Sequence, residues 1–120
     1  MTAVTRRIGP VRRLLMDAKA LIKKPENWCK RRNARSVTNK PSYTTSPLAC
    51  KFCAYSAVYR AYFNKGCPSP DERSVHETRS LIRDVLDGSL IEFNDAPETT
   101  HPMIMRLFNK AIKRAKEQGV

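Results

Sequence analysis

The chain has 120 residues, of which 41% are hydrophobic and 28% are charged, and its formal net charge is +12. This length suits one domain, this composition excludes a wholly disordered chain, and no apolar run reaches the roughly 18 residues that a membrane span needs. Without a membrane span or a secretory signal, the protein is expected to be cytoplasmic, with its four cysteines reduced.

The positive charge is concentrated in the first half of the chain. Residues 1–60 hold fourteen Lys or Arg and two Asp or Glu, whereas residues 61–120 hold nine of each. This asymmetry indicates a surface that meets a polyanion or an acidic partner. No strong catalytic or cofactor motif is present, so the sequence favours a binding protein over an enzyme and predicts no cofactor and no membrane contact.

In chain order, residues 1–9 are expected to form a flexible basic arm, and residues 10–118 a single helical domain. Apolar residues recur at helical spacing from Val11 to Ile22, and Pro25 ends this first helix. Residues 26–46 show no helical period. A basic loop or a short β-hairpin at 30–46, turning near residues 39–41, is predicted there.

The following segments predict three more helices. Ser46-Pro47 has the composition of a helix start, and residues 48–63 are apolar on most faces, which predicts a buried central helix. Ser69-Pro70 predicts the start of a third helix that ends at Gly88. A fourth helix is expected to open around Pro102. The predicted fold is therefore mainly α, with about four helices around the 48–63 helix.

Two sequence blocks carry a resemblance to a known family. They are Phe-Cys-Ala-Tyr-Ser-Ala-Val at 52–58 and Phe-Asn-Asp-Ala-Pro-Glu-Thr-Thr-His at 93–101, preceded by Pro-Glu-Asn-Trp-Cys at 25–29. In this order they resemble a family of small bacterial and bacteriophage proteins of unknown function, over roughly residues 11–115. The chain departs from the family pattern at Ser56, where Gly is expected. The resemblance implies a fold and an origin, but no activity.

The basic residues of the first half are candidates for nucleic-acid contact. Phosphates need only surface cations, without strict spacing, and planar Tyr and Arg groups can stack on unpaired bases. The alternatives are an acidic protein partner and a merely solvated charged surface. The candidate binding residues are Arg12, Arg13, Lys30, Arg31, Arg32, Arg35, Lys40 and Tyr43.

The four cysteines are weighed as a zinc site. Cys50 and Cys53 have the spacing of half such a site, which Cys29 and Cys67 could complete. However, Cys50 and Cys53 fall on the predicted 48–63 helix rather than on a turn. Reduced thiols without metal are therefore the favoured interpretation.

A last cluster comprises Asn94, Asp95, Thr100 and His101. The favoured interpretation is a structural turn, in which Asn94 and Asp95 bond nearby backbone groups and Thr100 caps the last helix. The alternatives are a ligand or partner surface and, as the weakest, a hydrolase in which His101 activates Cys53. Overall the sequence predicts a non-enzymatic protein that binds nucleic acid or a nucleic-acid-containing complex. Its runner-up is a small phage-type accessory or inhibitor protein that docks on an acidic host protein.

Overall fold

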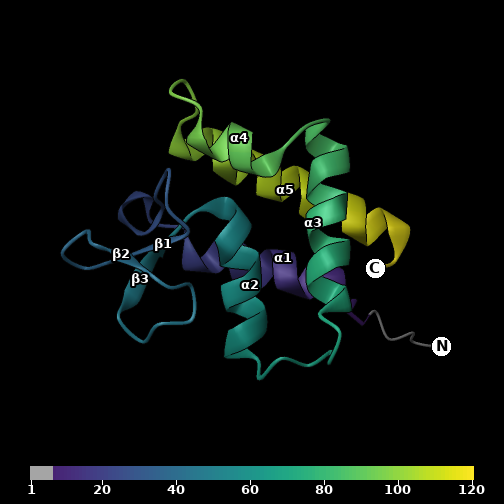
Figure 1. Ribbon diagram of the computed structural model, residues 1–120. Helices are drawn as coiled ribbons and strands as arrows, with labels where there is room; N and C mark the ends of the chain where they lie inside the picture. The colour runs from purple at the N-terminus through teal and green to yellow at the C-terminus, as the bar shows by residue number, and fades with distance from the viewer. Residues whose placement is uncertain (1–6) are drawn as a thin grey trace.

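The computed structural model describes residues 7–120 and shows a mainly helical fold with one small antiparallel sheet (Figure 1). This confirms the predicted fold class at that level. The predicted arm at 1–9 lies largely outside the described residues. The elements are α1 (Pro10–Leu21), the 3-10 turn η1 (Pro25–Asn27), β1 (Ala34–Ser36), β2 (Pro41–Ser42), β3 (Ala49–Phe52), α2 (Ala54–Asn64), α3 (Arg73–Leu86), α4 (Leu90–Asp95) and α5 (His101–Gln118).

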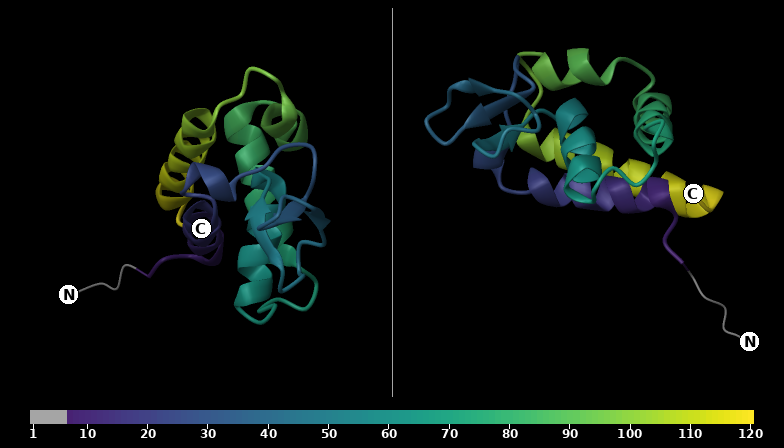
Figure 2. Two further views of the ribbon diagram at one scale, coloured as in Figure 1. Left: turned by 90° about the vertical axis from the view of Figure 1, so that its left-hand side faces the viewer. Right: turned by 60° about the horizontal axis from the view of Figure 1, so that its bottom comes forward.

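The core lies between the four longer helices. Helix α1 contacts α2, α3 and α5; Leu15 and Ala18 of its apolar stripe are fully buried, as is Ile22 directly after the helix. Figure 2 shows α1 and α5 side by side, with α3 beside them. The start of α1 meets the end of α5, where the Val11 N–H donates to the Val120 carbonyl oxygen at 3.0 Å. None of the helices within residues 7–120 is long and apolar enough to cross a bilayer.

The sheet forms the opposite end of the molecule from the C-terminus (Figures 1 and 2). Its strand order is β2-β1-β3, and both pairs are antiparallel. The turn between β1 and β2 contains Asn39 in a left-handed conformation (φ 66°), which Asn tolerates better than most residues. The predicted hairpin near residues 39–41 is thus present, and β3 adds a third strand that the sequence did not predict.

The predicted helix over 48–63 is wrong in its first third. Residues 49–52 form β3, because their backbone pairs with β1, and α2 begins only at Ala54. Ser46 does not cap a helix, since its Oγ accepts the Leu48 N–H at 3.1 Å and so forms a local turn. Cys53 is the residue that caps α2, its Sγ accepting the Ser56 N–H at 3.3 Å.

One further boundary and one additional helix differ from the prediction. Helix α3 begins at Arg73 rather than near Pro70, because Asp71 Oδ1 takes the Arg73 N–H at 3.1 Å and Glu72 adopts a left-handed conformation. The short helix α4 was not predicted. It is capped by Ser89, whose Oγ accepts the Glu92 N–H at 3.2 Å.

Candidate functional site

The two sequence blocks behind the family resemblance meet at one buried side chain, Asn94 of α4. Its Oδ1 accepts from Trp28 Nε1 at 2.7 Å and from the Ala54 N–H at 2.9 Å. Its Nδ2 donates to the Cys29 carbonyl at 3.1 Å and to Asp95 Oδ1 at 2.9 Å. Asn94 is 0% exposed, so protein partners take its whole hydrogen-bonding capacity. It joins the Trp28–Cys29 segment, the start of α2 and α4.

The neighbouring residues fasten the start of the basic segment to α4. Asp95 Oδ1 accepts the backbone N–H of Arg31 at 2.8 Å. Lys30 Nζ donates to the Ala96 carbonyl at 2.6 Å and lies 5.5 Å from the centre of the Trp28 ring. Lys30 was predicted to bind a partner, but its ammonium group is occupied by these contacts inside the molecule.

The weakest alternative from the sequence, a pairing of His101 with Cys53, is not present in the described structure. His101 Nε2 lies 2.7 Å from the Ile22 carbonyl oxygen and therefore donates to it, which ties the start of α5 to the end of α1. No hydrogen bond joins His101 to Cys53 within residues 7–120. Thr100 is at the N-cap position of α5, where its own N–H donates to Met103 Sδ at 3.5 Å.

The four cysteines lie in three separate places. Cys50 is on β3 and Cys53 at the start of α2, so the helical position predicted for both is wrong. Cys29 and Cys53 are buried, whereas Cys67 is exposed beyond the other end of α2, and all four are free thiols. Across residues 7–120, no three His, Cys, Asp or Glu side chains are grouped to hold a metal ion. Burial, and then the nearby Cys53, raise the pKa of Cys29 to about 11.

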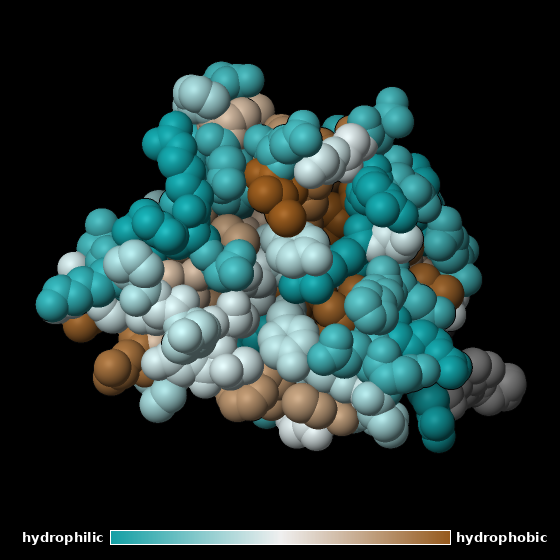
Figure 3. All heavy atoms as spheres, viewed as in Figure 1, coloured by the Kyte–Doolittle hydropathy of each residue, from teal (hydrophilic) through white to brown (hydrophobic). Residues whose placement is uncertain are grey.

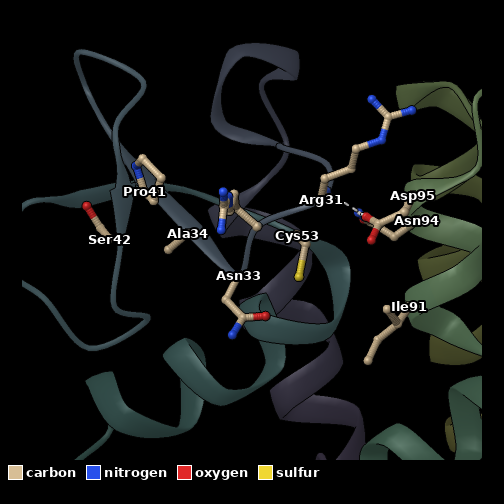
Figure 4. A pocket seen from close by; sticks show the side chains of 10 residues that line it. Arg31, Asn33, Ala34, Pro41, Ser42, Cys53, Ile91, Asn94 and Asp95 are labelled. Atoms are coloured by element: carbon tan, nitrogen blue, oxygen red, sulfur yellow. Dashed lines mark hydrogen bonds between the residues drawn. The ribbon is translucent and has the colours of Figure 1, made fainter.

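A cavity of about 320 Å³ opens between the sheet and α4. Figure 4 shows Cys53, Asn33, Ile91 and Asp95 around it. Arg31 lies at its edge, and its backbone N–H is the one held by Asp95. The Asn94 cluster is defined as Trp28, Cys29, Ala54, Asn94 and Asp95. Of these, Asn94 and Asp95 line the cavity, and Arg31 and Arg32 line it from the basic segment.

The basic face is formed by the segment 30–52, which we call the basic hairpin. Arg31, Arg32 and Lys40 are exposed, and Tyr43 is 86% exposed. Figure 3 shows this end of the molecule as largely hydrophilic, with hydrophobic atoms at its lower edge. Within the basic hairpin, the large apolar side chains Val37 and Leu48 are 81% and 73% exposed.

The cations of the basic hairpin have no carboxylate partner in the described part of the chain. The ion pairs among residues 7–120 join Lys65 to Asp17 and Arg73 to Asp71. Arg35 instead donates to the Asn39 carbonyl at 3.0 Å, and Lys51 Nζ lies 3.5 Å from Asn39 Oδ1. Lys51 was not among the predicted residues, although the lack of any acidic residue around it was a usable signal.

Arg12 and Arg13 lie apart from the hairpin. Both are in the first turn of α1, where the Arg12 N–H is 3.4 Å from the Val120 carbonyl oxygen. The sheet is at the other end of the molecule (Figure 1). The structure therefore does not bring these two arginines together with Arg31, Arg32, Arg35 and Lys40 in one continuous surface.

The fold and the site define a small, mainly α domain with a basic β-hairpin anchored on a buried asparagine. A family model covers residues 7–114 of this chain, and the chain belongs to that family, which is described as a family of unknown function (DUF6197). Searches of the curated proteins and of the solved structures each gave no match.

Proposed function

We propose that the protein binds single-stranded nucleic acid, without catalysing a reaction, through the basic hairpin. One observation carries the proposal: residues 27–70 contain no Asp or Glu, and the hairpin's cations form no ion pair within residues 7–120. Cations that no internal carboxylate neutralises are available to phosphates, which release counterions when they bind. The hairpin cations left for a partner are Arg31, Arg32, Arg35, Lys40 and Lys51, because the Lys30 ammonium group already donates to the Ala96 carbonyl.

The strand register supports the proposal. Arg35 on β1 is directly opposite Lys51 on β3. Like charges in facing positions of an antiparallel pair destabilise a sheet. An anion between the two side chains would remove that repulsion, so the sheet is expected to gain stability when a phosphate binds there.

Tyr43 favours an unpaired strand over a duplex. Its ring is almost fully exposed on the connection between β2 and β3, so packing against the core gives no reason for an aromatic residue at this position. Base stacking on an exposed aromatic ring requires a base that is free of its partner strand. A strand bound along the hairpin would thus have phosphates near the arginines and a base on Tyr43.

The second candidate function is docking on an acidic protein. Val37 and Leu48 favour it, because both are large apolar side chains exposed beside the cations. Protein interfaces combine an apolar centre with a polar rim, whereas phosphate contacts need no apolar groups. Either partner is expected in the cytoplasm, and a bacterial or phage origin stays a prediction from the family resemblance.

Charge reversal tests the proposal. The variant with Arg31→Glu, Arg32→Glu and Lys40→Glu should bind a short single-stranded oligonucleotide at least about a hundredfold more weakly by fluorescence anisotropy at low salt. The control is Arg106→Glu, Lys110→Glu and Lys113→Glu on the exposed side of α5, which changes the net charge equally. It should weaken binding much less. Equal weakening by both variants would contradict a hairpin site, and no binding by the unmodified protein would contradict the function.

A further inference from the structure

A second cavity, of about 410 Å³, lies between α2, α3 and α4, and all of its lining residues except Tyr55 come from the half of the chain that has no net charge. It is next to the first cavity, since Ile91 lines both. Among the described residues, no Asp or Glu lines it. The polar groups that line it belong to His76, Arg79, Ser80, Arg83 and Ser89.

Arg79 has an unusual environment for a cation. Its guanidinium lies 3.5 Å from the centre of the Tyr55 ring, and its Nε and Nη2 both donate to the Tyr55 carbonyl, at 3.2 and 2.8 Å. Burial lowers the pKa of Arg79, although a guanidinium still keeps its proton at neutral pH. No carboxylate forms an ion pair with it within residues 7–120.

An immobilised, partly buried cation without a counterion is costly to a fold. The Tyr55 carbonyl provides hydrogen bonds but no negative charge. Nη1 of Arg79 has no protein partner among the described residues, so one edge of the guanidinium is free to donate. Glu72 acts on Arg79 through its charge but forms no ion pair with it, so an anion from outside the chain would complete the environment of this guanidinium.

The rest of the cavity offers donors of the matching kind. His76 and Arg83 are exposed and lie three residues before and four residues after Arg79, on the same face of α3. Ser80 Oγ accepts from Arg83 Nη2 at 3.1 Å, which leaves its own O–H free to donate. Ser89 Oγ likewise accepts from the Glu92 N–H, and its O–H is free.

We infer that this cavity is a phosphate-binding site, in which Arg79 holds the group and His76, Arg83 and the two serines surround it. Arginine forks and hydroxyl donors suit the several acceptor oxygens of a phosphate. The inference rests on the residues of α3 and α4 and goes beyond the proposed role of the basic hairpin. Because the two cavities adjoin, a strand that crosses the hairpin can also place a phosphate here.

Phosphate titration tests the site. Inorganic phosphate, added at constant ionic strength to ¹⁵N-labelled protein, should shift the amide signals of Ser80, Arg83 and Ser89 in a saturable way. The double variant His76→Gln/Arg83→Gln should raise the dissociation constant about tenfold or more, because it removes two donors whose side chains are exposed. Arg106→Gln, an exposed arginine of α5, is the control and should leave the constant unchanged.

A third variant examines Arg79 itself. Arg79→Lys keeps the charge but removes the planar fork and its stacking on Tyr55, so phosphate binding should be lost. If this variant unfolds, the exposed pair still decides the question. The absence of saturable shifts, or an equal loss in Arg106→Gln, would overturn the inference.

The source of the phosphate is decided by two further probes. An oligonucleotide with a 5′-phosphate is compared with the same oligonucleotide without it, and a nucleoside 5′-monophosphate with its nucleoside. A preference for the phosphorylated oligonucleotide would assign the site to nucleic acid, and binding of the free monophosphate alone would assign it to a small metabolite. The charge-reversed hairpin variant should still bind inorganic phosphate, so failure of the hairpin site and failure of this site are distinguishable.

Discussion

The Asn94 cluster and the basic hairpin adjoin each other, and their polar groups are used in opposite ways. In the Asn94 cluster every donor and acceptor of the amide has a protein partner, and the side chain is fully buried. In the basic hairpin, no cation has a carboxylate partner among the described residues, and Tyr43 extends into solvent. The Asn94 cluster therefore fixes the position of the basic hairpin, and the hairpin is the region whose polar groups are free to meet a partner.

The largest effect is expected from Asn94→Ala. Trp28 Nε1, the Ala54 N–H and the Cys29 carbonyl would all lose a partner in the interior. The free energy of unfolding should fall by about 3 kcal/mol or more, because each buried group left unpaired costs about 1–3 kcal/mol. The melting temperature, measured by circular dichroism, should drop by more than about 10 °C.

The matched control for Asn94 is Asn109→Ala. Asn109 is an exposed residue of α5, and its substitution should change the melting temperature by less than about 2 °C, as for most surface changes. A stable Asn94→Ala protein that has lost binding would mean that Asn94 belongs to a ligand site, and the comparison of the two regions would fail.

A smaller effect is expected from Tyr43→Ala. Stacking of one base on an aromatic ring is worth about 1–3 kcal/mol, so oligonucleotide affinity should fall roughly tenfold while Tyr43→Phe keeps it. Stability should be unchanged, because the ring is exposed. Anisotropy titrations of both variants measure this. Equal affinities for Tyr43→Ala and the unmodified protein, with a loss in Val37→Ser, would favour the acidic protein partner instead.

The smallest effect concerns Cys29, which lies beside Asn94. Its pKa is raised to about 11 in the folded protein, mainly by burial, against about 9 when the chain is unfolded. The folded state therefore holds this proton more tightly, and the stabilisation is present below pH 9 and is lost as the pH rises from 9 towards 11. Denaturant titrations across this range should show a stability loss that is shallower in Cys29→Ala.

Cys67→Ala is the control for the pH experiment, because Cys67 is exposed and should keep the full loss of stability. If Cys29→Ala and Cys67→Ala lose stability equally between pH 9 and 11, the buried thiol is not the cause. The same two cysteines should also differ in alkylation of the folded protein at neutral pH, with Cys67 reacting first.

The sequence was sufficient for the long amphipathic helices and for the hairpin, because periodicity and turn residues are local signals. It was insufficient at 49–52, since a short apolar run is compatible with either a helix or a strand and only pairing with β1 decides. Helix α4 has six residues, which is too few for a period to be recognised.

The site was only partly predictable for a related reason. Three of the four hydrogen bonds of Asn94 reach residues 40 to 66 positions away, so no local pattern reveals them. Arg35 and Lys51 are opposite each other only because of the register of the two strands. The cavity around Arg79 depends on how α3 packs against α2 and α4. The charge of a segment is visible in its sequence, whereas the absence of a counterion is visible only in the fold.

The salt dependence of binding measures whether the hairpin's cations are free to meet phosphates. For a single strand, the logarithm of the affinity should fall with the logarithm of salt with a slope of about −3.5 if five cations take part. In Arg31→Gln/Arg32→Gln the slope should decrease in magnitude to about −2, and in Lys110→Gln/Lys113→Gln it should not change. An unchanged slope in the hairpin variant would mean that these cations do not contact the bound strand.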